Sequence, residues 1–349
     1  MPVPALLVAL SARLRPLLGE TPTLEPLTDT GLAHWHVRLN GTGLLARIPK
    51  QSQMGLTAAD NLAYEAACFN RATPSGHVPL LHLSVTPNDA LPWGALLVQE
   101  IAGTPANSTT HLPAIMRALA AIHRLSVPAP ALRPPLLCET PALSNMLQQI
   151  NTQAAYLDQP QVAPASRQTI QRTLSALSHS VTDLCRDLPP RLIAFDAHPG
   201  NFLITAQGQA VLVDLEKMRY GLPPLDLAHA TLYTSTTWDV SASFELSVVQ
   251  IAAAYQTWID TMGHEAAPYL RALVPLRTLM WLWSVTWCAK WLGESSRPRH
   301  QDGVGEDWSQ DNSESTLVAH VHNRVTHYLE PATIARVLAE LEALRPCWC

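Results

Sequence analysis

Three polar side chains in the second half of the chain have the types and the spacing that metal-assisted phosphoryl transfer requires. Asp196 is followed after four intervening residues by Asn201, and after twelve more by Asp214. Apolar runs at 202–205 and 210–213 predict a hairpin that places Asn201 and Asp214 close together, beside Asp196 on the preceding loop. Carboxylate and amide oxygens suit Mg²⁺ that is bound jointly with phosphates. Each residue alone could serve ordinary turn chemistry, but the joint spacing favours a catalytic site.

The Asp-x-x-x-x-Asn spacing matches the catalytic loop of kinases, where the aspartate accepts the proton of the substrate hydroxyl and the asparagine holds a metal ion. The stretch 192–216 resembles the aminoglycoside phosphotransferase and choline kinase family, whose signature runs His-Gly-Asp-x-His-Pro-x-Asn, with Asp-x-Glu on the next strand. The residues that fit this signature are Asp196, His198, Pro199, Gly200, Asn201, Asp214 and Glu216. The resemblance implies ATP and Mg²⁺ as cofactors, Asp196 as the catalytic base, and Asn201 and Asp214 as the metal ligands.

The resemblance extends to the first hundred residues, where the family binds its nucleotide. Members carry a Lys or Arg on the third strand and a Glu on the following helix, and Arg47 and Glu65 occupy similar positions. The resemblance therefore implies that Arg47, held by Glu65, clamps the phosphates. Gly31 is what remains of the family's glycine-rich loop, and Gln99 and Ile101 stand in the expected hinge after an apolar strand. These three residues are further candidates for nucleotide binding.

Other positions around the motif have alternative interpretations. Lys50 could replace Arg47 as the phosphate ligand, but the two lie an odd number of residues apart and so face opposite sides of one strand. His198 is expected to order its loop through hydrogen bonds to backbone or carboxylate groups. Glu216 is either a weak or outer metal ligand or a solvated charge at a strand end. Asp226 resembles the family's Asp-Leu-Ala helix start and is expected to be the helix N-cap.

Two departures from the family pattern leave alternatives open. Ala194-Phe195 stands where the family has His-Gly, so the loop lacks the orienting imidazole, and the glycine-rich loop keeps one glycine. The expected catalytic base Asp196 and the expected metal ligands Asn201 and Asp214 are nevertheless all present, which favours an active enzyme. The alternatives are a pseudokinase that binds nucleotide and regulates a partner, and a helical scaffold in which the motif is vestigial.

The surrounding sequence predicts an α+β chain with two unequal lobes. Strand-like segments are confined to the first hundred residues, apart from an island near 192–214. We expect the protein-kinase-like fold that the resemblance implies, with a small antiparallel-sheet lobe over 1–102 and a larger, mostly helical lobe over 103–349. The first would bind the nucleotide, and the second would hold the catalytic loop and the acceptor site. Helical periodicity is expected at 57–71, 108–125, 141–157, 165–188, 226–233, 241–262, 264–292, 315–328 and 331–344.

Trp283, Trp287 and Trp291 recur at four-residue steps, so they form one stripe along a helix. Such a stripe is most often core, and we expect this for Trp283 and Trp287, whereas Trp291 is left open. The alternative is that one end of the stripe lines the acceptor pocket, closed by the acidic segment 302–314. That arrangement would suit a cationic acceptor through cation–π contact.

Composition limits the partners. The 349 residues are 47% hydrophobic and 15% charged, with a net charge of −5, so we expect no nucleic-acid or membrane partner. The N-terminal apolar run is interpreted as an amphipathic helix, and the cysteines as reduced thiols, which predicts a cytoplasmic location. Only eleven residues separate Asp214 from Asp226, too few for a long activation segment, so the hydroxyl acceptor is expected to be a small molecule. Its class stays open among aminoglycosides, choline or ethanolamine, sugars and homoserine-like amino acids, as does the oligomeric state.

Overall fold

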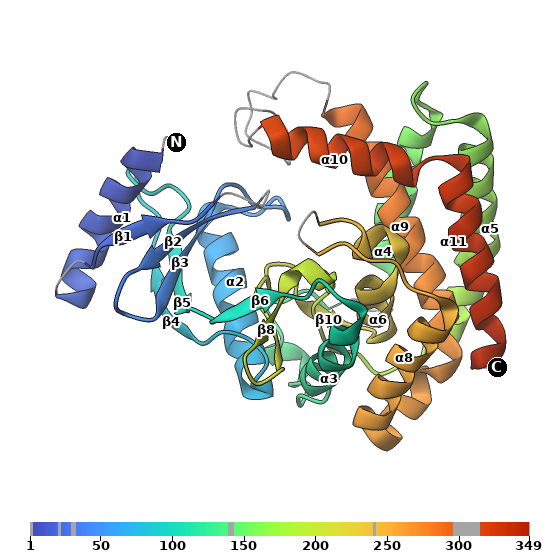
Figure 1. The fold of residues 1–349 in the computed structure, drawn as a ribbon, viewed down its shortest axis with the longest axis horizontal. Coiled ribbons are helices and arrows are strands. Elements are labelled where there is room, and N and C mark those ends of the chain that lie inside the picture. The colour runs from blue at the N-terminus through green and yellow to red at the C-terminus, as the bar shows by residue number, and fades with distance from the viewer. Residues whose placement is uncertain are drawn as a thin grey trace.

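The computed structural model describes residues 3–19, 22–28, 33–138, 143–239, 242–295 and 315–348, which form two lobes (Figure 1). The N-terminal lobe is built on an antiparallel sheet with the strand order β1-β2-β3-β5-β4. Its elements are α1 (Val3–Leu18), β1 (Leu24–Pro26), β2 (His34–Leu39), β3 (Leu44–Pro49), α2 (Ala58–Ala72), β4 (Leu81–Val85) and β5 (Ala95–Gln99). The predicted N-terminal helix and small antiparallel sheet are therefore confirmed.

The two faces of this sheet pack against different helices because successive strand residues point to opposite sides. Leu97 on β5 belongs to a core with Leu10 of α1, whereas Leu96 belongs to the larger core that contains Phe69 of α2. Helix α2 is also tied to the other lobe, since the Tyr64 hydroxyl donates to the Met218 carbonyl at 2.7 Å. One face of the small lobe is thereby held against the segment that carries the candidate metal ligands.

A tight turn that contains two glycines joins β2 and β3 into a hairpin. The turn glycines Gly41 and Gly43 have positive φ values of 80° and 70°, which suit glycine. The register pairs His36 with Arg47 across the two strands, so both side chains lie on one face. This face is turned toward the second lobe.

The C-terminal lobe is helical around a small strand-rich island. Strand β6 pairs with β8, which pairs with β9, and β7 pairs separately with β10. Helix α9 lies at the centre and contacts α4, α5, α6, α10 and α11. The elements are β6 (Gly103–Pro105), α3 (Leu112–His123), α4 (Ser144–Ala154), α5 (Pro164–Cys185), β7 (Arg191–Ile193), β8 (Phe202–Thr205), β9 (Ala210–Leu212), β10 (Arg219–Gly221), α6 (Pro224–Thr231), α7 (Tyr233–Thr236), α8 (Val248–Met262), α9 (Leu273–Glu294), α10 (Ser315–Tyr328) and α11 (Pro331–Leu344). The boundary after residue 102 falls just before β6 and remains a prediction.

Several predicted helices differ from the structure in their extent; those expected at 108–125 and 141–157, for example, each consist of an α-helix and a 3₁₀ segment. The helix expected at 264–292 is divided into a 3₁₀ segment, Gly263–Ala272, and α9. Pro268 lies inside that 3₁₀ segment and removes a donor that a regular helix would need. The helix expected at 241–262 begins only at Val248, where Ser247 and Gln250 form a capping box. The helix expected at 226–233 is interrupted at Leu232, which is extended.

None of the helices in the described parts of the chain is long and apolar enough to cross a membrane. Cys68, Cys185 and Cys288 are buried free thiols, as predicted, and Cys347 is exposed. Gly31, Cys349 and the acidic segment 302–314 lie outside the described residues.

Candidate active site

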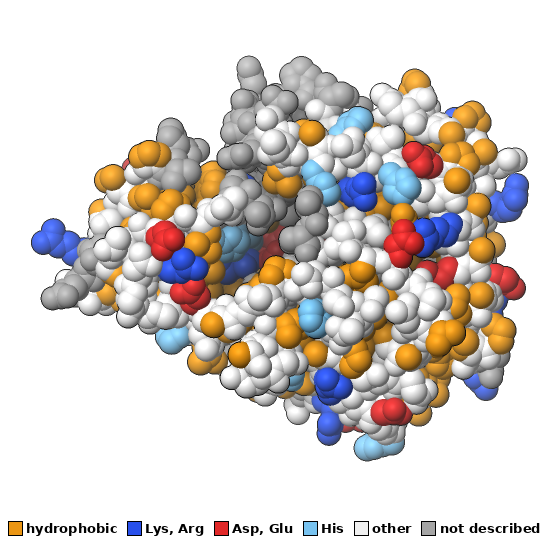
Figure 2. Space-filling model, in the orientation of Figure 1, with side chains coloured by type: hydrophobic (Ala, Val, Ile, Leu, Met, Phe, Trp, Pro, Cys, Tyr) orange, Lys and Arg blue, Asp and Glu red, His pale blue; other side chains and the backbone are white. Residues whose placement is uncertain are grey.

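A cavity of about 800 Å³ lies between the lobes and brings together most of the predicted site residues. The small lobe contributes side chains of β2 and β3 and the segment 99–101, and the large lobe contributes the loop 196–201 and parts of α9 and α10. The hollow is visible between the lobes in Figure 2, with histidine, basic and acidic side chains at its base. A volume of this size is in the range of small-molecule sites.

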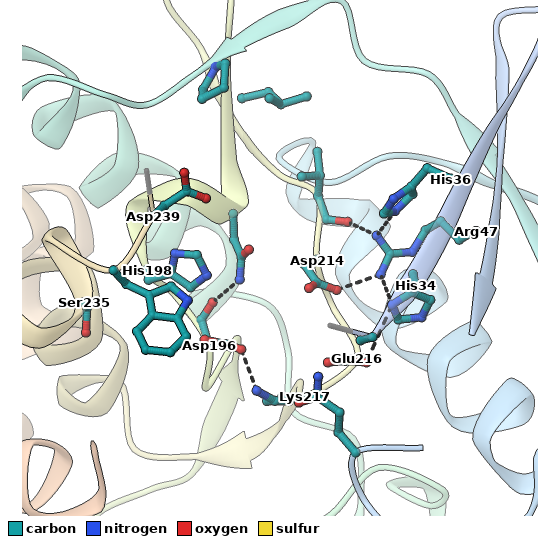
Figure 3. Close-up of a pocket in the computed structure, with 18 of the residues that line it drawn as sticks. His34, His36, Arg47, Asp196, His198, Asp214, Glu216, Lys217, Ser235 and Asp239 are labelled. Atoms are coloured by element: carbon teal, nitrogen blue, oxygen red, sulfur yellow. Dashed lines mark hydrogen bonds and ion pairs between the residues drawn. The ribbon is translucent and has the colours of Figure 1, made fainter. Parts of the chain in front are cut away.

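Asp196 lies on the loop between β7 and β8, and its carboxylate has a cationic neighbour. The Lys217 ammonium donates to Asp196 Oδ2 at 2.7 Å (Figure 3). His229 Nδ1 lies 3.5 Å from Asp196 Oδ1. Burial raises the pKa of Asp196, but Lys217 and the nearby imidazoles of His229 and His198 outweigh it and hold the pKa well below its usual range. The carboxylate is therefore ionised at neutral pH.

Asn201 and Asp214 are brought together by the predicted hairpin. The Val213 amide donates to the Asn201 carbonyl at 2.9 Å, which joins the two ends of the hairpin. The Asn201 side-chain amide donates to the Asp196 carbonyl oxygen at 2.9 Å. Because a carbonyl oxygen can only accept, the nitrogen of this side chain faces Asp196 and leaves Oδ1 as a possible metal ligand.

Arg47 extends from β3 into the cavity and binds the metal-ligand candidate Asp214. Its Nη2 atom lies 2.6 Å from Asp214 Oδ1, and its Nη1 atom donates to the Val213 carbonyl at 2.9 Å. Burial raises the pKa of the Asp214 carboxyl, whereas Arg47 and His34 lower it, and the net shift is downward. This charge-assisted contact connects the two lobes.

The predicted direct pairing of Arg47 with Glu65 is wrong in this structure. Glu65 Oε2 lies 3.0 Å from His34 Nε2, and Glu65 Oε1 accepts a hydrogen bond from the Asn61 amide at 2.7 Å. His34 Nδ1 in turn lies 3.5 Å from Arg47 Nη2. The imidazole is thus interposed between the two charges that the family pattern would pair directly.

Asp226 also has a different role from the one predicted. It lies inside the first turn of α6, whose N-cap is Pro223, and its carboxylate is fully buried. The backbone amides of Ala194 and Phe195 donate to it at 2.7 and 2.8 Å, and His123 Nε2 lies 3.0 Å away. Asp226 therefore holds the loop that precedes Asp196 instead of capping its own helix.

The prediction that Trp283 and Trp287 belong to the core is wrong, and Trp291, for which no choice was made, is a core residue. Trp283 and Trp287 are half-buried and line the cavity, whereas Trp291 is buried and packs against the His322 ring. Trp238, which precedes the undescribed residues 240–241, also lines the cavity and meets Trp287 edge to face at 5.7 Å. The stripe could not be divided correctly from spacing alone, since all three positions share one helix face.

The remaining predicted residues have mixed outcomes. Gln99 and Ile101 line the cavity, as positions for a nucleotide would require. His198 lines it too, but its buried Nδ1 atom has no hydrogen-bond partner within the described structure, so the predicted bonding from that atom is not found. Glu216 is buried beside His34, not solvated. Lys50 is buried over the Trp35 ring at 5.6 Å and is not among the residues that line this cavity.

Sequence reasoning missed His34, Lys217 and His229 as members of the site. A signal existed for His34, because His34 and His36 alternate along a strand that pairs with the strand of Arg47. Lys217 directly follows the Asp-x-Glu motif and could have been weighed as its counter-charge. No local pattern indicates His229, whose position depends on how α6 packs.

Comparison with known proteins agrees with this geometry. Residues 26–268 match the phosphotransferase enzyme family, which is more than half of the chain. No curated protein matches the chain in sequence. A choline/ethanolamine kinase family protein from Mesorhizobium loti has a similar structure, with 18% identity and a TM-score of 0.60, over 97% of this chain and 99% of that one.

Two further solved structures show the same likeness. Choline kinase LicA from Streptococcus pneumoniae has 14% identity and a TM-score of 0.56, over 93% of this chain and 99% of that one. The ADP-bound aminoglycoside phosphotransferase APH(2'')-Ib has 12% identity and a TM-score of 0.53, over 93% of this chain and 97% of that one. The likeness confirms the predicted two-lobed, protein-kinase-like fold. The chain belongs to the phosphotransferase enzyme family.

Proposed function

We propose that this phosphotransferase-family chain transfers the γ-phosphoryl group of ATP to a hydroxyl of a small molecule in an Mg²⁺-dependent reaction. The observation that carries the proposal is the meeting of Asp196, Asn201 and Asp214 around one interlobe cavity, with Arg47 facing them from the other lobe. Positioning and charge neutralisation supply most of the catalysis in reactions of this kind.

The donors around Asp214 suit a magnesium ion. Asp214 supplies a carboxylate, and the Asn201 amide turns its nitrogen to Asp196, so that its oxygen is available to a cation. Both residues line the cavity. A bound Mg²⁺ would neutralise the charge of the nucleotide phosphates.

The other side chains have roles that follow from their contacts. Asp196 is kept ionised by Lys217 and so can accept the hydroxyl proton of the acceptor or orient that hydroxyl. Arg47 would bind the phosphates, with Glu65 acting on it through His34. Gln99 and Ile101 lie where the base of the nucleotide could be held between the lobes.

The acceptor end of the cavity combines aromatic rings with unused hydrogen-bonding groups. Trp238, Trp283 and Trp287 line it. Thr234 and Ser235, both buried, also line it, and their hydroxyl oxygens have no hydrogen-bond partner among the described residues. Indole faces attract cations, and free hydroxyls can bind a polar substituent. Of the candidate classes, an amino alcohol such as choline or ethanolamine fits these features best.

One contact favours a second candidate, a nucleotide-binding pseudokinase. Arg47 pairs with Oδ1 of Asp214, and its positive charge opposes a metal ion at the same carboxylate. If that ion pair persists when nucleotide binds, the chain would bind ATP without transferring its phosphate.

The test is incubation of the full chain with Mg²⁺-ATP and a panel of hydroxyl compounds, with phosphorylated product detected by mass spectrometry. Acceptors are first selected by melting shift, since a ligand at 100 times its Kd contributes ~2.7 kcal/mol. The transfer-deficient Asp196→Asn variant is the control. Product with the wild type alone supports the proposal, whereas ATP binding without product from any acceptor class would favour the pseudokinase.

A further inference from the structure

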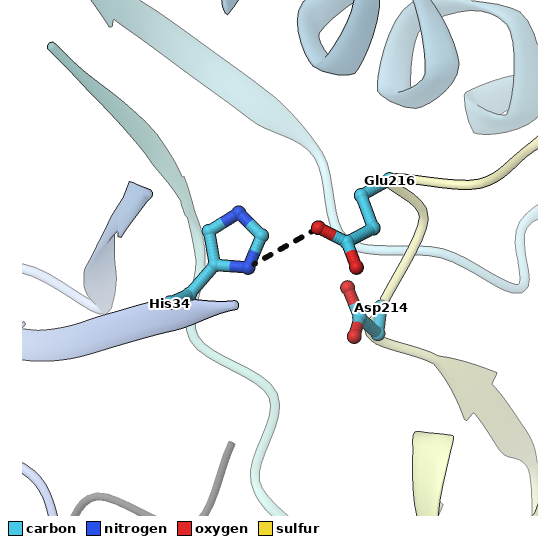
Figure 4. Close-up of side chains that lie close together, drawn as sticks. All are labelled: His34, Asp214 and Glu216. Atoms are coloured by element: carbon cyan, nitrogen blue, oxygen red, sulfur yellow. Dashed lines mark ion pairs between the residues drawn. The ribbon is translucent and has the colours of Figure 1, made fainter. Parts of the chain in front are cut away.

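His34, Asp214 and Glu216 form a cluster at the base of the cavity whose donor set differs from oxygen-only magnesium sites (Figure 4). One ligand atom from each residue lies within 4.8 Å of the others. His34 comes from β2 of the small lobe, whereas the two acidic residues follow β9 of the large lobe. His34 Nδ1 lies 3.7 Å from Glu216 Oε2. The cluster therefore joins an imidazole nitrogen to two carboxylates across the interlobe cavity.

The orientation of His34 is fixed from behind by a carboxylate. Its Nε2 atom lies 3.0 Å from Glu65 Oε2, and the Asn61 amide donates to the other oxygen of Glu65 at 2.7 Å. Because a carboxylate only accepts, Nε2 carries a proton, and Nδ1 lies on the side of the two acidic residues, where the ring in its neutral form would offer a lone pair to a metal ion. Metal-binding histidines characteristically donate their second ring N–H to a carboxylate in this way.

Glu216 is a buried carboxylate that receives no hydrogen bond from the described part of the chain. It is 8% exposed, and no group in the described residues donates a hydrogen bond to its side chain, while His34 Nδ1 lies 3.7 Å from its Oε2 atom. A buried polar group of this kind needs a partner, and a cation between the two carboxylates would supply one.

We propose that His34 Nδ1, Asp214 and Glu216 together bind a divalent first-row transition metal, for which Mn²⁺ is the probe. An imidazole ligand favours such ions over Mg²⁺, which prefers oxygen ligands. Metal–ligand bonds of about 2.1 Å hold two ligand atoms roughly 3–4 Å apart. The ligand atoms of the cluster lie within 4.8 Å of one another, so the largest of these distances has to shorten by only about 1 Å. The role of this metal toward nucleotide rests on the proposed function, but its binding does not.

Arg47 is the resident cation that such a metal must overcome. It contacts Asp214 at Oδ1 with a distance of 2.6 Å and lies 3.5 Å from His34 Nδ1. Asp214 Oδ2 is outside that contact and can face a metal while the ion pair remains. Repulsion between Arg47 and the ion lowers the affinity of the site in the absence of phosphates.

The experiment uses the metal-stripped full chain and Mn²⁺ alone, without nucleotide. Titration followed by EPR measures the affinity, and pulsed EPR detects nitrogen modulation from a directly bound imidazole. We expect one site with nitrogen modulation, and His34→Gln should abolish the modulation. Glu65→Gln should keep the modulation and weaken Mn²⁺ binding by about 10- to 100-fold, because it changes only the group that contacts the other ring nitrogen of His34. His82→Gln, at an exposed position on β4, is the matched control and should change neither quantity.

Several results would overturn the metal site. These are the absence of Mn²⁺ binding, binding without nitrogen modulation, or modulation that survives in His34→Gln. If His34→Gln fails to fold, Glu216→Gln provides the second test and should weaken Mn²⁺ binding while the nitrogen modulation of the residual complex remains. Transfer from Mg²⁺-ATP is assayed separately, so loss of the Mn²⁺ site would leave the proposed phosphotransfer standing, and failure of transfer would leave the metal site standing.

Discussion

Replacing Asp226 by asparagine perturbs the side chain that holds the loop of Asp196, the proposed catalytic residue. In the structure this fully buried carboxylate accepts two backbone amides, from Ala194 and Phe195, and a third hydrogen bond from His123. The direction of the third bond is set by Trp258, whose indole N–H donates to the other ring nitrogen of His123 at 3.0 Å. Asparagine has the same shape, but its NH₂ group must face one of these donors. At least one buried donor then loses its acceptor, and the charge that strengthens the others is lost.

The magnitude follows from the number of bonds affected. Hydrogen bonds to charged groups contribute about 1.5–3 kcal/mol each, and loss of one partner of a buried charged network costs about 3–5 kcal/mol. An unfolding entropy of ~2.1 cal/mol/K per residue over 349 residues gives a melting temperature lower by about 4–7 °C. We also expect kcat to fall while the KM for ATP changes little, because the perturbed loop carries Asp196 and not the residues proposed to bind the nucleotide.

The measurement is thermal unfolding of the purified variant together with ATP binding by calorimetry. Asp260→Asn on the exposed face of α8 is the matched control and should melt within about 1 °C of the wild type. An Asp226→Asn variant that melts with the wild type and keeps its kcat would refute the assigned role of this network.

Four further predictions follow from the site. Asp196→Asn should lower transfer by ~10²–10⁴-fold in a product assay, with ATP affinity measured by calorimetry nearly unchanged. Asp214→Ala should remove the Mg²⁺-dependent part of the ATP-induced melting shift, whereas Asn201→Ala should only reduce it, since a charged ligand contributes more; equal shifts in wild type and Asp214→Ala would contradict the metal assignment. Trp291→Leu should lower stability by about 2–3 kcal/mol in denaturant unfolding because it opens a core cavity, while Trp287→Leu should raise the acceptor KM about 2- to 30-fold if the acceptor is cationic. Burial lowers the pKa of His229 to about 4, so between pH 6.5 and 4 the unfolded chain binds a proton there that the folded chain does not. The free energy of unfolding therefore falls as the pH falls through this range. His229→Gln should flatten this part of the curve of unfolding free energy against pH, by at most about 3 kcal/mol.

The parts of the site that could be predicted from the sequence are those encoded locally. Asp196, Asn201 and Asp214 lie within nineteen residues, and hairpin geometry alone brings the last two together. The β2–β3 turn and the start of α2 at the Thr57 cap were likewise predictable, because glycine φ values and side-chain capping act over a few residues. Alternation along a strand was enough to separate Arg47 from Lys50.

The partners of these residues could not be predicted, because they depend on packing between distant elements. Arg47 could pair with Glu65 of its own lobe or with Asp214 of the other lobe. The structure shows the pair with Asp214 and places His34 between Arg47 and Glu65. An aspartate at the start of a helix predicts an N-cap, and Asp226 stands at such a position. In the structure its carboxylate instead accepts hydrogen bonds from the backbone amides of Ala194 and Phe195 in the adjacent loop. Trp283 and Trp291 are equivalent in spacing, and only the position of α10 and the cavity distinguishes them.

Phe195 shows how the departure from the family's His-Gly can be accommodated without loss of the loop. Its φ is +62°, in the left-handed region that glycine adopts without strain and that costs a bulky residue about 1–2 kcal/mol. The Asp226 carboxylate holds the amide of this residue, the Arg219 guanidinium lies 3.6 Å from its ring centroid, and Trp283 meets the ring edge to face at 5.4 Å. These contacts, each worth about 0.5–3 kcal/mol, can offset the strain. Because Trp283 also lines the cavity, the aromatic residue before Asp196 connects the loop of the proposed catalytic residue to the proposed acceptor wall, a connection that a glycine could not make.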